Sequence, residues 1–559
     1  KNEGCDIEFI FSNNPRDILK YTKDILASDI HTRNNTKKLL EDADIILGLD
    51  DIMTKSINGS GYNSKYGLLG SNKSTDELLK LFPENGKELV LGIQKDIKNR
   101  TGKNVEVMIY GDGAFKDPIG KIWELADPVV SPFYTDGLEG TPNEIKLKYV
   151  SDNTLSDLHG EELNKAMKEE IKKKDSEYIM HTYGRFDIVL DHGKGATLWD
   201  ADGKQYVDLT SGIGVNSLGH GNPEIVNAVT KQAEKLMHAS NLYYTEPMVS
   251  AAEKLVTATG MGKIFFANSG AEANEGAIKV ARKYSFDKYG ERRNTIVTLI
   301  QSFHGRTVTT LKATGQEKFH QYFFPFTEGF AYAKANDLAD VTAKADKACC
   351  AVMMEMIQGE GGVLPLDKEF VQGVAKFCKE HDILLIVDEV QTGIGRCGSL
   401  FAYEQYGISP DIVTMAKGLG GGLPIGGVLT SAACADVMGP GTHGSTFGGN
   451  PVSAASANVV LDTVNDPEFL KEVQEKGAYI KEKVLGFHSS AVKNVRGMGL
   501  MLGIIVDPEK RAGYVSKLME KGILVLTAGT DAIRLLPPLV ITYEEIDQAL
   551  EAMKGVFES

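Results

Sequence analysis

From about Tyr178 onward, the sequence alternates short apolar runs with amphipathic helical segments, and this alternation constrains the fold more than any other feature. Gly or Pro turns separate the two kinds of segment. The apolar runs are GKIFFANSG, NTIVTLIQ, KACCAVMMEMI, DILLIVDEV and PDIVTMAKG. Strands that alternate with helices in this way predict a mostly parallel sheet with right-handed crossovers.

The two ends of the chain have a different pattern of apolar and helical segments, and this pattern predicts further domains. Residues 1 to about 150 alternate apolar patches (DIEFIF, ADIILGL, ELVLGI, VEVMIYG) with turn clusters, which indicates a small mixed α and β unit. A charged helix, EELNKAMKEEIKKKD at 161–175, follows as a linker. The helix-rich C-terminal end, with the strands MLGIIV and ILVL, predicts a smaller α+β domain. We therefore expect one domain at 1–171 and a second region at 172–559. The second region is expected to consist of an N-terminal segment (172–230), a large domain (231–450) and a small C-terminal domain (451–559).

Composition limits the function classes. The 559 residues are 42% hydrophobic and 25% charged, which is typical of a globular protein. The formal net charge of -15 disfavours nucleic acid and anionic lipid as partners. The uncharged run Gly418–Ala435 is long enough for a membrane span, but its six glycines and Pro424 indicate loop and turn.

The cysteines and the N-terminal end bear on the compartment. Six cysteines stand in a long chain without a Cys-x-x-Cys pair, which favours a reducing, cytoplasmic setting. No basic and then apolar targeting segment opens the sequence. The chain begins at Lys1 instead of methionine, which suggests a fragment.

One glycine motif matches a dinucleotide-binding pattern but lacks the remainder of that fingerprint. GIGRCG at Gly393–Gly398 matches the G-x-G-x-x-G pattern and follows an apolar run. Gly418 stands about twenty residues further on, where that fingerprint places an acidic ribose ligand, and no strong helical pattern opens at the last glycine. The sequence therefore disfavours a nicotinamide or flavin enzyme.

A stronger signal comes from an acid and a base at the ends of two apolar runs. Asp388 closes ILLIVD, and Lys417 closes DIVTMAK shortly before the glycine-rich GLGGGLPIGG. In an α/β sheet both side chains would project from the carboxyl ends of neighbouring strands, where ligands bind. Pyridoxal phosphate needs such a pair, a lysine for the Schiff base and a carboxylate against the ring nitrogen.

Three further motifs suit the same cofactor. Ser269 and Gly270, in NSGAEANEG, stand at a predicted helix start, where backbone N–H groups bind phosphate. SFHGRTV combines the aromatic Phe303 with the cation Arg306, one to stack on a flat ring and one to bind a carboxylate. HGSTFGGNP offers the hydroxyls of Ser445 and Thr446 as a second phosphate site.

Together these motifs identify the region from about Lys172 to Ser559 as similar to class III pyridoxal-phosphate aminotransferases, and especially to the acetylornithine aminotransferases. The resemblance implies a fold-type I transferase, with a large cofactor-binding domain and a smaller C-terminal domain. The matching runs are MHTYGRFDIVLDHGKGATLWDADGKQYVDL, NSLGHGNP, FANSGAEANEGAIK, FHGRT, IQGEGGV, DEVQTGIGR, AKGLGGGLPIG, HGSTFGGNP and RLLPPL.

The resemblance also implies residue roles. Lys417 and Asp388 match the catalytic pair, and Thr446 matches a residue that reaches the cofactor phosphate across a homodimer interface. Met356 departs from the family, which usually has proline there. The implied cofactor contacts are Ser269, Gly270, Ala271, Phe303, Asp388, Glu389, Val390, Gln391, Lys417 and Thr446. The implied substrate contacts are Arg306, Glu360, Ser445 and Arg534, with Glu360 pairing with Arg534 in one half-reaction.

The implied reaction is transamination of N2-acetyl-L-ornithine with 2-oxoglutarate, giving N-acetyl-L-glutamate 5-semialdehyde and L-glutamate in arginine biosynthesis. No tyrosine lies between Leu209 and His220, where ornithine aminotransferases carry one that helps to hold ornithine. Acetylornithine is therefore favoured, while ornithine, succinylornithine and 4-aminobutyrate stay open. A non-catalytic scaffold of the same fold is disfavoured by the intact Lys417 and Asp388 pair.

The N-terminal region resembles another family. KYGLLGSNKSTDE and YGDGAFKDPIGKIWELADPVVSP are similar to the gamma-glutamyl ligases of the deazaflavin coenzyme. There, an aspartate matching Asp112 helps to hold a divalent metal. Ala114, Phe115 and Lys116 replace the arginine-rich stretch of the ligases, which favours a non-catalytic lobe. A bifunctional protein with a metal- and nucleotide-dependent N-terminal domain is the alternative. No metal is expected in the aminotransferase part.

Overall fold

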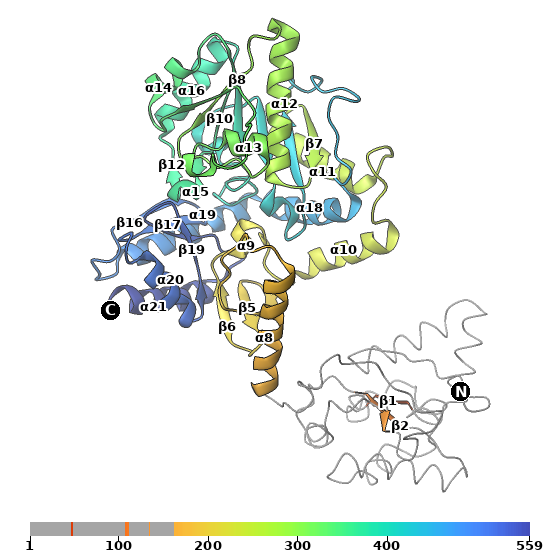
Figure 1. Cartoon of the computed structure of the whole chain (residues 1–559), viewed down its shortest axis with the longest axis vertical. Helices are drawn as coiled ribbons and strands as arrows, with labels where there is room; N and C mark the ends of the chain where they lie inside the picture. Colours follow the sequence, from red (N-terminus) through yellow and green to blue (C-terminus); the bar gives the residue numbers. More distant parts are fainter. Residues whose placement is uncertain (1–45, 49–106, 111–132, 135–160) are drawn as a thin grey trace, which may run out of the picture. The chain divides into compact units, whose positions relative to one another are not determined.

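The computed structural model describes residues 46–48, 107–110, 133–134 and 161–559, which belong to two compact units divided after Met180. In the first unit the apolar patches ADIILGL and VEVMIYG supply two parallel strands, and a third strand pairs antiparallel to the second (Figure 1). The elements are β1 (Ile46–Gly48), β2 (Val107–Tyr110), β3 (Phe133–Tyr134) and α8 (Glu161–Tyr178). Helix α8 confirms the predicted helix, whereas Asp112 lies outside the described residues.

The second unit is built on a seven-stranded sheet, in the order β7-β15-β14-β13-β10-β8-β9. Every strand except β15 runs in one direction, which confirms the predicted mostly parallel sheet. The strands are β7 (Lys263–Ala267), β8 (Thr295–Leu299), β9 (Phe330–Ala333), β10 (Cys349–Met354), β13 (Leu384–Asp388), β14 (Ile412–Met415) and β15 (Gly426–Thr430).

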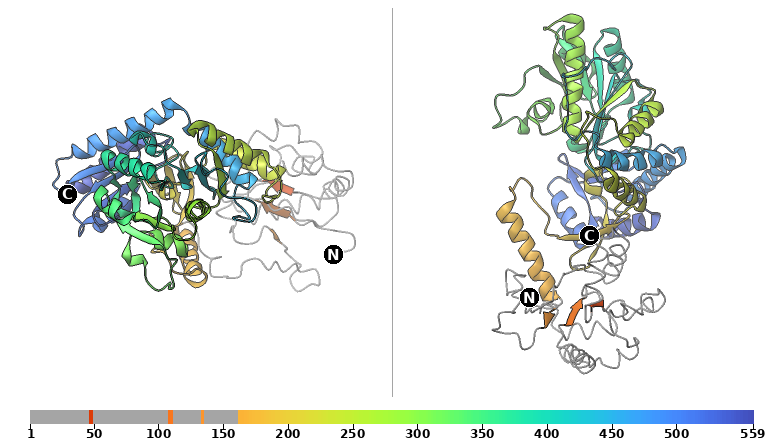
Figure 2. Two further views of the ribbon diagram at one scale, coloured as in Figure 1. Left: turned by 90° about the horizontal axis from the view of Figure 1, so that it is seen from above. Right: turned by 90° about the vertical axis from the view of Figure 1, so that its right-hand side faces the viewer.

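Both faces of this sheet are covered by helices, because successive side chains of its strands point to opposite sides. In β13, Leu384 and Ile386 belong to one buried cluster with α12 (Gly270–Tyr289), whereas Leu385 and Val387 belong to a second cluster. Helices α11 (Glu246–Thr259) and α16 (Lys368–Glu380) contribute to that second cluster, on the other side of the sheet (Figure 2).

Strand β15 corrects one prediction. It lies inside the glycine-rich run Gly418–Ala435, which the sequence indicated to be loop and turn throughout. Glycine is required here because neighbouring backbone approaches closely, and a side chain at Gly426 would lie 2.5 Å from the carbonyl oxygen of Ser269. No helix among the described residues has both the length and the apolar character to cross a membrane.

Two smaller sheets complete the second unit. The run ILVL, predicted as one strand, supplies β18 (Ile523–Leu524) and β19 (Leu526–Ala528), which belong to different sheets. One sheet has the order β18-β6-β5-β4 and the other has the order β16-β17-β20-β19. Their remaining strands are β4 (Leu190–Lys194), β5 (Thr197–Asp200), β6 (Gln205–Asp208), β16 (Asn494–Met498), β17 (Met501–Ile505) and β20 (Ala532–Leu535).

Short elements and helices connect these sheets. A two-stranded hairpin of β11 (Ile357–Gln358) and β12 (Leu364–Pro365) encloses α15 (Gly359–Gly362). The other helices of the second unit are α9 (Ser211–Gly214), α10 (Pro223–Lys235), α13 (Val308–Ala313), α14 (Leu338–Lys344), α17 (Tyr403–Tyr406), α18 (Pro451–Val464), α19 (Pro467–Leu485), α20 (Arg511–Glu520) and α21 (Tyr543–Phe557), with 3-10 turns η2 (Glu317–Phe319) and η3 (Lys417–Gly420).

Candidate active site

The acid and the base predicted from the sequence lie at the ends of neighbouring parallel strands. Asp388 is the last residue of β13, and Lys417 follows β14 by two residues and opens η3. Lys417 has a φ of 44°, a left-handed conformation that is uncommon for a residue with a side chain. The Ser217 hydroxyl donates to the carbonyl oxygen of Gly418 at 2.8 Å and so fixes the peptide between Gly418 and Leu419, one residue beyond the lysine.

Asp388 is buried within a set of hydrogen-bond donors. Its Oδ2 accepts from Nδ2 of Asn274 at 2.7 Å and lies 2.8 Å from Nδ1 of His304, while its Oδ1 accepts from the backbone N–H of Val390 at 3.0 Å. Such contacts stabilise and orient an ionised carboxylate. Sequence reasoning missed the roles of Asn274 and His304, although Asn274 is a polar residue among the largely apolar buried residues of α12.

Two more titratable side chains surround Lys417. Burial lowers the pKa of the Lys417 amine, an effect that the carboxylates of Glu360 and Asp388 partly oppose. Glu355 is buried as well, and burial together with the charge of Asp388 raises the pKa of Glu355 well above its ordinary value. Its Oε2 accepts from the backbone N–H of Phe303 at 3.0 Å.

A partly buried ion pair joins α15 to the sheet that contains β20. Arg534, in β20, donates from Nη1 to Oε1 of Glu360 at 2.5 Å and to Oε1 of Gln391 at 3.2 Å. Burial acts to raise the pKa of Glu360, but the Arg534 guanidinium beside it holds that pKa below the ordinary value. The structure thus brings these three predicted residues together, and the charges of Glu360 and Arg534 also act on the Lys417 amine.

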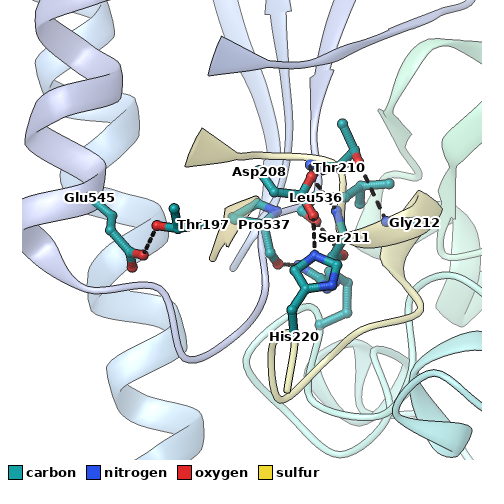
Figure 3. A network of polar contacts seen from close by, with 10 residues as sticks. Thr197, Asp208, Thr210, Ser211, Gly212, His220, Leu536, Pro537 and Glu545 are labelled. Atoms are coloured by element: carbon teal, nitrogen blue, oxygen red, sulfur yellow. Dashed lines mark hydrogen bonds and ion pairs between the residues drawn. The ribbon is translucent and has the colours of Figure 1, made fainter. Parts of the chain in front are cut away.

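The β20 end that carries Arg534 is anchored to the segment after β6. The Ser211 hydroxyl donates to the carbonyl oxygen of Leu536 at 2.5 Å (Figure 3). Oδ1 of the fully buried Asp208 accepts from the backbone N–H of Ser211 at 3.0 Å, and Oδ2 of Asp208 lies 2.8 Å from Nε2 of His220. This network fixes the chain two residues beyond Arg534.

The predicted phosphate site lies at the start of α12. Ser269 is the N-cap, and its hydroxyl accepts from the backbone N–H of Glu272 at 3.2 Å. A side chain at Gly270 would lie 2.5 Å from Cγ1 of Val390, so only glycine fits between the helix and that residue. The first turn, which includes Ala271, therefore offers backbone N–H groups at the positive end of a twenty-residue helix.

Arg306, the other arginine predicted to bind substrate, lies over two aromatic rings. The guanidinium carbon of Arg306 lies 4.2 Å from the ring centre of Phe319 and 5.4 Å from that of Phe303. The two rings meet edge to face. Arg306 is exposed and differs in this from the buried Arg534, so the two arginines stand in different surroundings.

The remaining predicted residues divide into two groups. The hydroxyl of Ser445 accepts from Nδ2 of Asn268 at 3.1 Å and therefore lies near the start of α12, whereas Thr446 is exposed. The carboxylate of Glu389 accepts from the Thr392 hydroxyl and from the backbone N–H of Tyr403. Its carboxylate therefore has two hydrogen-bond donors, and burial raises the pKa of Glu389 to about 7.

Comparison with known proteins identifies the family of this chain. Residues 178–557 match the family described as aminotransferase class-III. The chain belongs to the class-III aminotransferases. The acetylornithine aminotransferase of Haemophilus ducreyi is 52% identical over 390 residues, which cover 69% of this chain and 98% of that protein. This membership confirms the predicted resemblance.

Solved structures confirm the predicted fold-type I architecture of this class-III aminotransferase. The ornithine aminotransferase of Toxoplasma gondii has a TM-score of 0.67 at 32% identity, covering 70% of this chain and 94% of its own. The N-acetylornithine aminotransferase of Stenotrophomonas maltophilia has a TM-score of 0.60 at 36% identity, covering 68% and 97%. Residues 7–174 match the family described as F420-0:gamma-glutamyl ligase, which confirms the second resemblance.

Membership of the class-III aminotransferases implies pyridoxal phosphate, and the residues around Lys417 fit that group. They combine an amine, a buried carboxylate and a helix N-terminus. The buried atoms that have no hydrogen-bond partner among the described residues include three at this site: Oδ1 of Asn274, Nε2 of His304 and Nε of Arg534. Buried polar atoms are normally paired, so the site retains capacity for a polar ligand.

Proposed function

We propose that this class-III aminotransferase transfers the terminal amine of N2-acetyl-L-ornithine to 2-oxoglutarate, producing N-acetyl-L-glutamate 5-semialdehyde and L-glutamate in arginine biosynthesis. The observation that carries the proposal is the 52% identity to an acetylornithine aminotransferase, over 98% of that protein's length. The ion pair of Glu360 and Arg534, beside Gln391, supports the proposal. A pocket for two substrates with different numbers of carboxylates needs a cation that a protein carboxylate can neutralise when the substrate does not.

Pyridoxal phosphate is the proposed cofactor, and this chain offers a group for each of its parts. When bound, the cofactor supplies a ring that accepts electrons from the substrate carbon that carries nitrogen. Asp388, oriented by Asn274 and His304, is the proposed partner of the ring nitrogen. Ser269, Gly270 and Ala271 are the proposed phosphate ligands. Phe303 would pack on the ring face, and Glu389, Val390 and Gln391 would lie around the ring.

Lys417 is the proposed covalent anchor and proton carrier. Burial lowers the pKa of its amine and so increases the neutral fraction, which can accept a proton. The left-handed backbone at Lys417, with the Gly418 carbonyl bound by Ser217, fixes the origin of the side chain. The amine can therefore reach one substrate carbon repeatedly and move a proton there in both half-reactions.

Glu360 is proposed to form an ion pair with Arg534 in one half-reaction and to release it in the other. Acetylornithine presents a single carboxylate, far from the reacting amine, so an unpaired Arg534 would be a buried, uncompensated charge during that half-reaction. Pairing with Glu360 removes this cost. 2-Oxoglutarate carries a second carboxylate, which takes the place of Glu360 on Arg534, while Arg306 and Ser445 contact the far end of either substrate.

A homodimer with shared sites is proposed as the active form. Nδ2 of Asn241 donates to the carbonyl oxygens of Ser445 at 3.1 Å and Gly448 at 2.9 Å, so two loops run side by side. These loops expose large apolar side chains beside Thr446, namely Leu242, Tyr243, Tyr244 and Phe447. A second copy would cover this surface and receive Thr446 at its cofactor phosphate.

A panel of amine donors tests the proposal, with 2-oxoglutarate as acceptor. We expect the highest kcat/KM for acetylornithine, followed by succinylornithine, and lower values for ornithine and 4-aminobutyrate. A preference for ornithine or 4-aminobutyrate would overturn the assignment of the donor.

The described cysteines are all buried and free, which fits a reducing compartment such as the cytoplasm.

A second function rests on the match of residues 7–174 to the F420-0:gamma-glutamyl ligase family. A bifunctional protein would bind a divalent metal and a nucleotide in that part of the chain, with Asp112 as one metal ligand. Titration of the whole protein with nucleotide and Mg²⁺ tests this. Binding that Asp112→Asn abolishes would support the second function, and absence of binding would leave a non-catalytic lobe.

A further inference from the structure

We propose that Arg496 is a positioning residue for the substrate switch: it fixes the backbone of the loop at 359–363, so that only the side chain of Glu360 moves between the half-reactions. This inference rests on the proposed function, because it concerns the alternation of Glu360 and substrate on Arg534. It is carried by the small C-terminal sheet and by its contacts with that loop.

Arg496 and Arg534 lie in one row across three neighbouring strands. Gly503 of β17 is the register partner of Arg496 in β16 on one side and of Arg534 in β20 on the other. Side chains of directly opposite residues point to the same face of a sheet. The two arginines therefore share a face and flank a glycine.

The loop that carries Glu360 packs against this face. A side chain at Gly503 would lie 3.0 Å from Cβ of Val363, so the glycine allows the loop to approach between the two arginines. Figure 1 shows α15 and β12 next to the sheet that contains β16 and β17. Arg534 reaches the side chain of Glu360 at one end of the loop.

Arg496 binds the backbone at the other end. Its Nε donates to the carbonyl oxygen of Gly362 at 2.9 Å, and its Nη2 donates to Oδ1 of Asp531 at 2.7 Å. The half-buried guanidinium therefore has a carboxylate partner, and the contact with the loop adds no unpaired charge. Asp531 belongs to the turn between β19 and β20, so the pair also ties the loop to the strand of Arg534.

The same turn binds the loop a second time. The backbone N–H of Gly529 donates to the carbonyl oxygen of Glu360 at 3.0 Å. A side chain at Gly529 would lie 2.3 Å from the carbonyl oxygen of Gly361, so the two backbones are in direct contact. Two carbonyl groups, those of Glu360 and Gly362, are thus held from the small sheet by different donors.

Because of these contacts, the switch requires movement of the Glu360 side chain but not of its backbone. With its backbone held on both sides, the Glu360 carboxylate can leave Arg534 by rotation of its own side chain and then return to the same position. Loss of the Arg496 contact would let the loop shift and weaken the Glu360 and Arg534 pair. This would impair the half-reaction that needs the pair and spare the half-reaction in which substrate replaces Glu360.

Single-turnover measurement of each half-reaction tests this, with the holoenzyme and its Arg496→Ala and Arg496→Lys variants. We expect Arg496→Ala to lower kcat/KM for acetylornithine about tenfold, from the loss of hydrogen bonds to a charged group. We expect the 2-oxoglutarate half-reaction to change by less than about twofold. Arg496→Lys keeps the charge but loses the planar pair of donors, so its defect should have the same selectivity.

A matched control and a double variant exclude a merely structural role. Arg293 is also half-buried, and it donates to the carbonyl oxygens of Cys349, His381 and Asp382, outside the site. Arg293→Ala should leave the ratio of the two half-reactions unchanged. In a Glu360→Ala background, Arg496→Ala should have no further effect on the acetylornithine half-reaction, because the group that it positions is absent.

Equal losses in both half-reactions, or additive losses in the double variant, would overturn the inference. Failure of the proposed function would be seen separately, as poor turnover of acetylornithine by the unaltered enzyme. The same comparison would then be made with the preferred donor, and the selectivity of Arg496→Ala would still decide whether the residue acts through Glu360.

Discussion

Nδ1 of His304 lies 2.8 Å from Oδ2 of Asp388, although 84 positions separate the two residues. His304 is buried, and its backbone carbonyl accepts from the same Asn274 amide that donates to Asp388. The three side chains therefore form one unit, in which the direction of the carboxylate is set by two donors from different elements.

The first prediction concerns this unit. His304→Ala should weaken cofactor binding by about tenfold, because a charge-assisted contact to the buried Asp388 is lost. Titration of cofactor-free protein with pyridoxal phosphate, followed by absorbance, gives the affinity. His381→Ala, at an exposed histidine, is the control and should bind normally. Unchanged affinity in His304→Ala would show that Asp388 does not depend on the histidine.

The second prediction concerns the covalent anchor. Borohydride should fix pyridoxal phosphate irreversibly to the unaltered protein, but not to Lys417→Ala, because only this lysine opens the turn after β14. Lys263→Ala removes an exposed lysine that pairs with Asp436 and should label normally. Peptide mapping of the reduced protein locates the label, and a label at any other lysine would refute the assignment.

The third prediction follows from the lowered pKa of Glu360. A carboxyl group whose pKa is lower in the folded than in the unfolded state stabilises the fold above its unfolded pKa. That stability is lost as the pH falls through the folded pKa. Glu360→Gln should therefore show a shallower loss of stability below about pH 4.3, the ordinary carboxyl pKa. Urea unfolding at a series of pH values measures this, and identical slopes would contradict it.

The sequence predicts the strand ends of this site well. Asp388 and Lys417 could be placed at one edge of a sheet because uninterrupted apolar runs such as ILLIV are typical of buried parallel strands. The start of α12 is equally predictable, since Ser269 suits an N-cap and the regular helical pattern begins at Gly270. Local pattern is sufficient for both, because each depends on residues that are close in the chain.

Other features depend on contacts that no local pattern contains. The contribution of Asn274 to Asp388 spans 114 positions. Gly426 of β15 is a glycine because the backbone of Ser269 approaches it, so the composition of this strand indicated a loop. The run ILVL divides between two sheets because β18 pairs with β6 and β19 pairs with β20. In each case a distant partner decides the local structure.

The fourth prediction concerns the shared site. In a mixture of Lys417→Ala and Thr446→Val subunits, each mixed dimer would contain one site with both native residues. Random mixing of two impaired proteins should therefore restore about one quarter of the native sites. Activity of the mixture after subunit exchange measures this. Activity no greater than the mean of the two separate variants would show that Thr446 does not serve the neighbouring subunit.

The last prediction separates the two arginines by half-reaction. Arg534 is buried and paired with Glu360, whereas Arg306 is exposed and lies over two aromatic rings. Acetylornithine needs one carboxylate contact, and 2-oxoglutarate needs two. Arg534→Ala should therefore damage the 2-oxoglutarate half-reaction by on the order of 2 to 4 kcal/mol of transition-state stabilisation, and the acetylornithine half much less.

Arg306→Ala should instead damage both half-reactions, because each substrate places its far carboxylate on that residue. Single-turnover rates of cofactor conversion, measured with each substrate separately, give the two losses. Arg534→Lys keeps a positive charge without the planar donors and should fall between the native enzyme and Arg534→Ala in the 2-oxoglutarate half. Equal losses in both halves for Arg534→Ala would reject the switch, since Arg534 would then bind both substrates alike.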